Sequence, residues 1–267
     1  MKNFKDKVAV ITGAGSGIGR ALAIALARDG AQLALSDVNA AGLAETLKQL
    51  PAGTKAKTYL LDVSSQEAVF AHADEVKRDF GTVHLLFNNA GTTLVGLFDN
   101  QSLDEMRWLV NINLWGVIYG TKAFLPMMLA QREGVIVNLS SVLGLVGFPT
   151  HSAYNITKFG VRGLTESLWS ELKGTGVTAV CVHPGGINTG FDQRAKISKG
   201  SDEREQKIIK NMTGTMRTTP DDCAADMLAG IRQGKRRIVT GRLSSLMFWL
   251  PRLFPSSYHR FLTSITR

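Results

Sequence analysis

The chain alternates short apolar runs with longer segments of helical periodicity, and this alternation restricts the possible fold more than any other feature of its 267 residues. Seven runs are rich in leucine or β-branched residues and lack a regular polar alternation, so each predicts a strand buried on both faces. Strands of this kind belong to parallel sheets covered by helices, so we expect one α/β domain with a doubly wound, seven-stranded parallel sheet. The runs are KVAVITG, QLALSD, AKTYLLD, VHLLFNNAG, GVIVNLSS, VTAVCVHPG and RRIVTG.

Helices are expected between these strands, at about residues 18–30, 40–50, 65–80, 103–131, 154–173 and 220–233. Ligands of doubly wound sheets bind beyond the carboxyl ends of the strands, so functional residues should directly follow the apolar runs.

Cysteine content and apolar run length indicate the compartment. The two cysteines, Cys181 and Cys223, have no spacing typical of a disulfide framework or a zinc site. The polar first residues lead directly into the first strand, and no apolar run reaches the roughly 18 residues of a transmembrane helix. These features predict a cytoplasmic protein.

The positive charge is concentrated at the C-terminal end. The net charge is +9, yet residues 227–267 contain eight Lys or Arg and no Asp or Glu, while residues 1–226 contain 23 basic and 22 acidic residues. The basic character therefore describes the end of the chain and says little about the rest.

A glycine-rich segment, TGAGSGIG at residues 12–19, follows the first predicted strand and begins the first predicted helix. Backbone amides and the positive helix end at such a turn can hold a pyrophosphate, which indicates a Rossmann-type dinucleotide site. The alternative is a tight strand-to-helix turn without a ligand.

Asp37 ends the second predicted strand, where a carboxylate can accept hydrogen bonds from the adenosine ribose. A 2′-phosphate would meet this carboxylate without a compensating charge, because the nearest basic residue of the loop is Arg20. NAD is therefore favoured over NADP. Asp37 could instead be a helix N-cap or a turn carboxylate.

Five separated motifs resemble those of the short-chain dehydrogenase/reductase family, over roughly residues 5–240 and in the family's order. They are TGAGSGIG, LDV at 61–63, NNAG at 88–91, YNITK at 154–158 and PGGINT at 184–189. The resemblance implies an NAD-dependent oxidoreductase that interconverts an alcohol and a ketone by direct hydride transfer, without a metal. It also implies a homodimer or homotetramer assembled through the helices near 103–131 and 154–173.

The resemblance assigns cofactor contacts to residues beyond the glycine-rich turn. It places Asp62 at the adenine amino group and Thr189 near the nicotinamide. Asp62 could instead cap the next helix, and the Asn88–Asn89 pair could merely satisfy backbone groups. The complete set is Gly13, Gly15, Ser16, Gly17, Ile18, Gly19, Asp37, Asp62, Val63, Asn89, Ala90, Gly91, Tyr154, Lys158, Pro184, Gly185, Ile187 and Thr189.

Tyr154 and Lys158 are spaced i, i+4, which places both on one helix face. Alcohol oxidation needs a base, and a nearby ammonium lowers the pKa of a tyrosine toward working pH. The resemblance adds Ser141, which would hold the substrate oxygen, and Asn113, which would bend a helix and link Lys158 to solvent through water. Ser140 and Asn111 are the weaker candidates beside them.

Substrate contacts are expected from Ser141, Leu143, Phe148, His151 and Tyr154, and Val146 is expected to complete a mainly apolar wall near Tyr154. These side chains suggest a medium-sized hydrophobic alcohol or ketone, with His151 at the pocket edge. Residues 190–219 are polar and charged, and they are expected to form a substrate loop that is mobile before ligand binds. The charges of this loop suit a solvated helix face better than recognition of a charged substrate.

Residues 242–267, called the tail below, follow a predicted dehydrogenase domain of residues 1–241. Most cytosolic family members end near Gly241. Apolar residues recur at helical spacing but are interrupted by Pro251 and Pro255, which predicts two short amphipathic helices. The apolar positions are Leu246, Leu250, Leu253, Phe254, Tyr258, Phe261, Leu262 and Ile265.

Three partners could receive the tail: its own domain or a partner subunit, an anionic membrane surface, or a nucleic acid. The apolar content disfavours a nucleic acid. For the whole protein, the alternative to an enzyme is a non-catalytic NAD-binding sensor or scaffold on the same fold.

Overall fold

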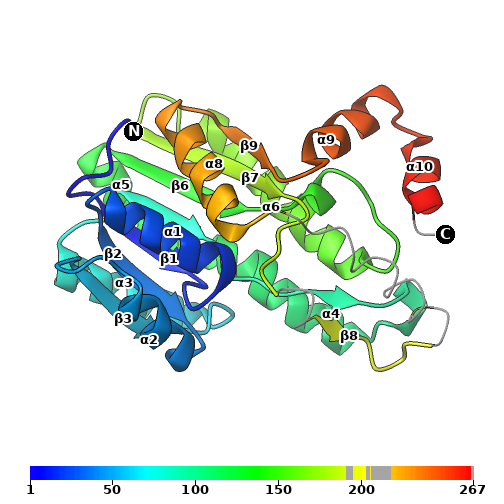
Figure 1. Ribbon diagram of the computed structural model, residues 1–267, viewed down its shortest axis with the longest axis horizontal. Coiled ribbons are helices and arrows are strands. Elements are labelled where there is room, and N and C mark those ends of the chain that lie inside the picture. The colour runs from blue at the N-terminus through cyan, green and yellow to red at the C-terminus, as the bar shows by residue number, and fades with distance from the viewer. Residues whose placement is uncertain (191–194, 203–204, 206–217, 266–267) are drawn as a thin grey trace.

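The computed structural model describes residues 1–190, 195–202, 205 and 218–265, with side chains described as far as residue 262. Seven strands form one parallel sheet in the order β3-β2-β1-β4-β6-β7-β9, as predicted (Figure 1). The order reverses between β1 and β4, where doubly wound sheets bind their ligands. The strands are β1 (Val8–Thr12), β2 (Gln32–Asp37), β3 (Ala56–Leu60), β4 (Leu85–Asn88), β6 (Gly134–Leu139), β7 (Val177–Pro184) and β9 (Arg237–Thr240).

Helices cover both faces of the sheet, and each face has its own apolar core. One core joins the sheet to α1 through Leu22 and to α8 through Met227. The other joins it to α3, α5 and α6 through Val76, Phe124 and Leu168. The helices are α1 (Gly17–Arg28), α2 (Ala40–Lys48), α3 (Gln66–Phe80), α4 (Leu103–Val110), α5 (Gly116–Gln131), α6 (Ser152–Glu171) and α8 (Pro220–Arg232).

The helix expected over residues 103–131 is interrupted. A π-helical turn, Asn111–Trp115, lies between α4 and α5 and buries Asn113. Such turns insert an extra residue into a helix and are frequent at functional sites. The interruption lies at the asparagine for which a bend was expected.

The tail forms α9 (Ser244–Leu253) and α10 (Tyr258–Ile265), so two short helices are present as predicted. The expected break at Pro251 is wrong, because this residue lies inside α9; Pro255 lies in the turn that follows. Within the described ranges, no helix is long and apolar enough to cross a bilayer.

His72 of α3 is a buried imidazole between the rings of Tyr59 and Phe124, with ring centroids 4.7 and 5.9 Å away. Burial lowers its pKa to about 4. Between pH 6.5 and 4 the unfolded chain therefore binds a proton that the folded protein does not, so stability falls as the pH falls through this range.

We expect this histidine to remove about 3 kcal/mol of the free energy of unfolding between pH 6.5 and 4. Urea unfolding of wild type and His72→Phe across this range measures the effect. The phenylalanine variant should lose less stability on acidification. Equal slopes for the two proteins would contradict the assignment.

Candidate active site

The glycine-rich turn leads from β1 into α1 and packs against the segment that follows β7. Gly17 has a φ of +52°, which favours glycine, and a Cβ added there would lie 3.1 Å from the Cβ of Thr189. The side chain of Thr189 thus lies against the start of α1. The structure therefore brings together two motifs that are far apart in the sequence.

Asp37 holds the glycine-rich turn from the end of β2. One carboxylate oxygen accepts from the Gly15 amide at 2.9 Å and the other from the Asn39 amide at 2.9 Å. The helix-cap alternative for Asp37 is wrong, because Asn39 is the N-cap of α2 and its side chain accepts from Gly42. The other alternative, that Asp37 is a turn carboxylate, agrees with these two hydrogen bonds.

Arg20, the basic residue nearest to this carboxylate in the loop, is engaged by the protein itself. Its guanidinium donates to the Gly15 carbonyl at 2.5 Å and to the Thr46 hydroxyl at 3.0 Å. These bonds join α1 and α2 to the turn.

Asp62 and Val63 lie between β3 and α3. The Asp62 carboxylate accepts from the amide and the hydroxyl of Ser64, while Ser65 caps α3. Asp62 is therefore a turn residue beside the cap, and the expectation that it caps the helix is wrong. Val63 is buried, and a Cβ on Gly116 would lie 2.9 Å from its side chain.

The NNAG motif links β4 to β1 and to α5. The Thr12 hydroxyl accepts from the amides of Asn89 and Ala90, both at 3.0 Å, and Asn89 donates its side-chain amide to the Thr12 carbonyl at 2.8 Å. Asn88 is buried and donates to Asn138 of β6 at 2.8 Å. The two asparagines thus satisfy polar groups at the strand ends, which agrees with the alternative given for them in the sequence analysis.

Tyr154 and Lys158 lie on the first turns of α6, and both are buried, at 8% and 4% exposed. The Lys158 ammonium lies 5.5 Å from the centroid of the Tyr154 ring and donates to the Leu139 carbonyl at 2.9 Å. Burial lowers the pKa of Lys158 to about 8. The pair has the geometry expected from its i, i+4 spacing.

Asn113 faces the same space from the π-helical turn. It accepts from the Thr92 amide at 2.9 Å and donates to the Thr92 carbonyl at 2.8 Å. A Cβ added to Gly91 would lie 3.2 Å from the Asn113 amide oxygen and 3.7 Å from the Lys158 ammonium, so both side chains converge on this glycine. Asn111, the weaker candidate, is exposed.

Ser141 follows β6 and precedes a 3-10 turn, η3 (Val142–Gly144), in which its hydroxyl accepts from the Leu143 amide at 3.1 Å. The competitor Ser140 donates its hydroxyl to the Lys158 carbonyl at 2.8 Å and so supports the backbone of α6. The two adjacent hydroxyls therefore have different partners in the protein.

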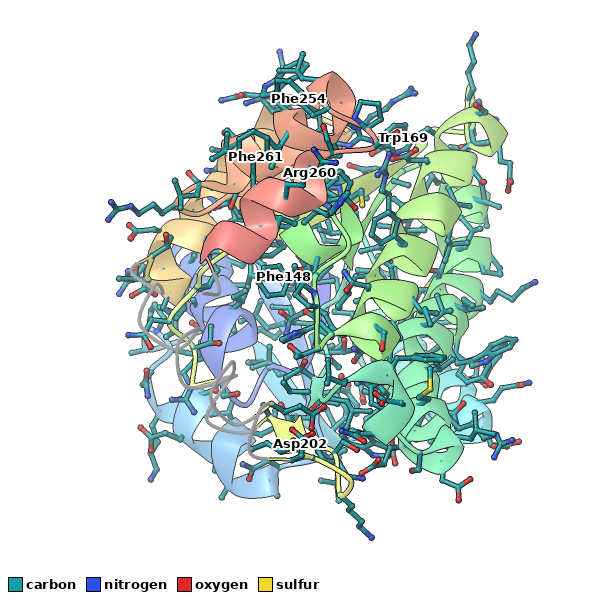
Figure 2. The ribbon with its side chains drawn as sticks, turned by 90° about the vertical axis from the view of Figure 1, so that its right-hand side faces the viewer. Phe148, Trp169, Asp202, Phe254, Arg260 and Phe261 are labelled. Atoms are coloured by element: carbon teal, nitrogen blue, oxygen red, sulfur yellow. The ribbon has the colours of Figure 1, made fainter. Side chains whose placement is uncertain are left out.

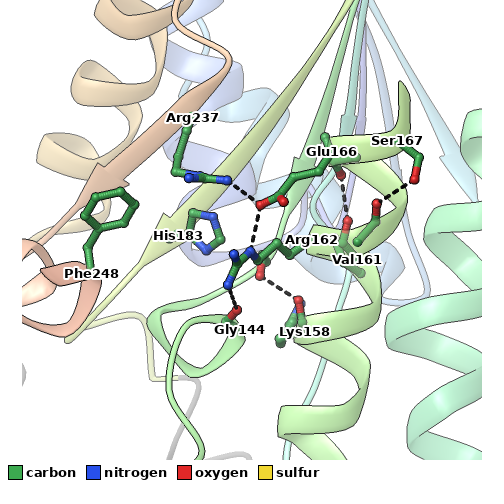
Figure 3. A network of polar contacts seen from close by, with 12 residues as sticks. Gly144, Lys158, Val161, Arg162, Glu166, Ser167, His183, Arg237 and Phe248 are labelled. Atoms are coloured by element: carbon green, nitrogen blue, oxygen red, sulfur yellow. Dashed lines mark hydrogen bonds and ion pairs between the residues drawn. The ribbon is translucent and has the colours of Figure 1, made fainter. Parts of the chain in front are cut away.

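A partly buried polar network joins α6 to its neighbours (Figure 3). Arg162 binds Glu166 at 2.7 Å and reaches the Gly144 carbonyl at 3.5 Å, and Arg237 also binds Glu166. Burial raises the pKa of Glu166, but the hydrogen bond from Arg162 and the two arginine charges outweigh it and lower that pKa overall. The network ties α6 to β9 and η3.

His183 of β7 lies beside this network and donates from Nδ1 to the Ser141 carbonyl at 3.0 Å. Burial lowers its pKa to about 4, which favours the neutral imidazole. Its hydrogen bond fixes the backbone that carries the Ser141 hydroxyl.

The expected apolar wall is present in part. Leu143 packs against Tyr154, whereas Val146 is fully buried beneath the tail, against Leu250 and Leu262. Val146 therefore packs on the tail and is not part of the expected wall beside Tyr154. Leu143 packs against both clusters and links the tail to α6.

Phe148 and His151 continue this wall. The ring of Phe148 lies 5.9 Å from His151, which lies 6.3 Å from Tyr154, each pair edge-to-face. Burial lowers the pKa of His151, partly opposed by its hydrogen bond to the Pro149 carbonyl. A neutral imidazole beside the wall agrees with a pocket-edge residue.

The segment after β7 carries the remaining motif. The Gly185 amide donates to the Thr240 carbonyl at 3.0 Å, and Ile187 is buried and pairs with Thr218. Pro184 ends β7, and its carbonyl accepts from the Ser141 hydroxyl at 3.5 Å. Thus the PGGINT motif lies between the glycine-rich turn and Ser141.

The loop expected over residues 190–219 is described only in part. Its residues 196–197 form β8 (Lys196–Ile197), which pairs in parallel with β5 (Leu94–Val95), so this part is not the irregular loop that was predicted. Buried Glu105 of α4 accepts from the Ser198 hydroxyl at 3.1 Å and the Lys199 amide at 3.2 Å. The mobility expected of residues 191–194 and 206–217 lies outside the described residues.

The sequence did not reveal several residues that hold the segments around Ser141 and Tyr154 in place. The Arg162–Glu166 pair has helical i, i+4 spacing and could have been noticed. Arg237 is far away in sequence and gives no such signal. Tyr258, whose hydroxyl accepts from the Gly147 amide at 3.0 Å, was identified only as an apolar position of the tail.

Known proteins share both the sequence and the fold. Residues 7–200 match the family described as short chain dehydrogenase. SadH of Mycobacterium tuberculosis, which is described as an oxidoreductase, is 43% identical over 99% of this chain and 96% of SadH. Cyclohexanol dehydrogenase of an Acinetobacter species is 37% identical over 70% of this chain and 75% of that enzyme.

A solved structure, a short chain dehydrogenase/reductase from Burkholderia phymatum in complex with NAD, has a TM-score of 0.87 and 33% identity over 95% of both chains. The match to SadH extends into the tail, so the tail is not peculiar to this chain. The five motifs, the sheet order and these likenesses agree: the chain belongs to the short chain dehydrogenase family of oxidoreductases.

Proposed function

We propose that this protein is an NAD-dependent oxidoreductase that interconverts a hydrophobic secondary alcohol and its ketone, with Tyr154 as the acid/base. The observation that carries the proposal is the buried Lys158 ammonium, 5.5 Å from the Tyr154 ring centroid and converging with Asn113 on Gly91. A buried cation beside a phenol favours the phenolate, which is the form that can accept a proton from an alcohol.

The residues present fit a dinucleotide. A side chain at Gly17 would meet Thr189, so the backbone at this position stays bare at the start of α1, where backbone amides and the helix dipole favour a pyrophosphate. Asp37 lies at the end of β2, where it would meet the adenosine ribose. Its negative charge and the engagement of Arg20 within the protein support NAD over NADP.

When bound, the nicotinamide would supply hydride transfer to or from the carbinol carbon. The protein's own residues would bind the substrate oxygen and transfer its proton. Ser141 would donate a hydrogen bond to the substrate oxygen, and Tyr154 would take the hydroxyl proton during oxidation or return it during reduction. Lys158 would stabilise the phenolate, and Asn113 would hold the π-helical turn beside it.

The wall beside Tyr154 supports a hydrophobic substrate. Leu143 and Phe148 are apolar, and His151 is biased toward its neutral form by burial. The likeness to a cyclohexanol dehydrogenase supports the same class of secondary alcohol. These side chains would place the carbinol carbon without any charged contact.

Assembly and location are further parts of the proposal. Exposed apolar side chains on the π-helical turn and α6, namely Trp115, Ile156 and Phe159, support a homodimer or homotetramer formed through the helices near 103–131 and 154–173. A cytoplasmic location stays a prediction.

Titration of the purified protein with NADH and NADPH, followed by turnover of a panel of secondary alcohols, tests the proposal. We expect NADH to bind at least about tenfold more tightly, because a 2′-phosphate would face the Asp37 carboxylate. The double variant Asp37→Ser with Val38→Arg should reverse the preference. Tighter NADPH binding by wild type would refute the cofactor assignment, and NADH binding without turnover of any alcohol would count against the reaction.

A further inference from the structure

One side of the tail packs on the domain. Toward the domain, Leu250 and Leu262 pack on Val146, and Tyr258 binds Gly147. Phe248 lies on the same side, 5.6 Å from the guanidinium of Arg237 (Figure 3). These contacts hold α9 and α10 on the substrate side of the molecule.

The opposite side of the tail, called the outer face, is apolar and exposed. On α9 it comprises Leu246, Trp249 and Leu253, which recur at intervals of three and four residues and so share one side of the helix, and exposed Arg242 lies just before α9. Phe254, Arg260 and Phe261 extend it along the chain (Figure 2). The exposed fractions are 52% for Leu246, 55% for Trp249, 67% for Leu253, 46% for Phe254 and 53% for Phe261.

Several large apolar side chains exposed together on one surface mark an interaction site. The outer face therefore calls for an occupant, and charge decides between the candidates. Residues 227–267 contain no Asp or Glu, and Arg242 and Arg260 border the apolar side chains. A second copy packed through this face by a two-fold axis would oppose arginine to arginine without a carboxylate from this segment.

We propose that the outer face binds the surface of an anionic membrane. Tryptophan, phenylalanine and leucine would enter the boundary between headgroups and acyl chains, and the arginines would meet the lipid phosphates. The two helices are short and carry charges, so they would lie on the bilayer. Binding of this kind does not depend on the proposed reaction.

Flotation of the full-length protein with vesicles of phosphatidylcholine, with and without phosphatidylglycerol, tests the proposal. Removing the tail would also uncover Val146, so substitutions on the outer face are the better probe. Leu246→Ser, Trp249→Ser and Leu253→Ser together should weaken binding at least about tenfold. The matched control, Phe98→Ser with Leu103→Ser, removes two apolar side chains that are 66% and 67% exposed elsewhere and should bind like wild type.

A charge variant adds a second arm. Arg242→Gln with Arg260→Gln should lower binding to the anionic vesicles by about 25-fold, because each arginine near such a surface contributes about fivefold. Thermal melting shows that the variants are folded. Absence of wild-type binding to phosphatidylglycerol vesicles would overturn the proposal. So would a triple variant that binds like wild type, or one that changes only the oligomeric state in light scattering.

Discussion

Replacing Tyr154 by phenylalanine should lower kcat for alcohol oxidation by about 10³-fold and leave NADH affinity nearly unchanged. The phenol ring lies beside the buried Lys158 ammonium and packs against Leu143. Phenylalanine keeps the packed ring and removes the proton acceptor. Steady-state turnover and NADH fluorescence titration measure the two effects separately.

The matched control is Tyr59→Phe. Tyr59 is also a buried tyrosine beside a lysine, with the Lys57 ammonium 5.5 Å from the centroid of its ring, but it lies on β3, the edge strand, and its hydroxyl donates to Asp79 of α3. This variant should keep wild-type kcat. Full turnover by Tyr154→Phe would disprove the acid/base role, and wild-type biological effect without measurable turnover would support a sensor.

Lys158→Met should reduce kcat/KM by about 10²-fold or more, because the phenolate would lose its buried cation. Methionine has a similar length and can fill the space between α6 and β6. Lys158→Arg keeps a positive charge and should retain more activity than methionine. A methionine variant as active as the arginine variant would contradict the electrostatic role.

The lowered pKa of Lys158 also predicts a pH dependence. Burial brings this pKa to about 8, so the free enzyme carries the ammonium below about pH 8 and loses it above. The kcat/KM for oxidation should therefore decline on the alkaline side in wild type, and Lys158→Arg should lack this decline because arginine stays charged.

Stability gives an independent measure of the same group. An unfolded lysine titrates near pH 10.5, so between pH 8 and 10.5 the unfolded chain binds a proton that the folded protein has released. The free energy of unfolding should rise by about 3 kcal/mol across this window as the burial penalty disappears. Lys158→Met should not show the rise.

Much of the fold could be predicted because its signals are local. Apolar runs buried on both faces indicate parallel strands, and the motif order indicates how those strands connect. The structure accordingly confirms the seven-stranded sheet and brings Gly17, Thr189, Asn113 and Lys158 to one edge of it. The resemblance selected Ser141 over Ser140 and Asn113 over Asn111, and this choice stays a prediction; in the structure Ser140 binds the α6 backbone and Asn111 is exposed.

The remaining features depend on contacts between distant segments. The pairing of β5 with β8 joins two-residue strands that carry no periodic signal. The burial of Val146 depends on side chains more than one hundred residues later in the chain. In the tail, Leu246 and Leu250 are both apolar positions of the helical pattern. Which of the two is buried depends on the domain surface against which α9 packs.

The π-helical turn also sets the phase of the helix that follows it. Leu109 of α4 and Thr121 of α5 are both buried, yet twelve residues of regular α-helix would place them about 120° apart around the axis. One extra residue in the turn brings them to within about 20°. Deleting a single residue between 111 and 115 would therefore force a choice: either Asn113 turns away from Gly91, or α5 rolls Phe124 and Met128 off the sheet.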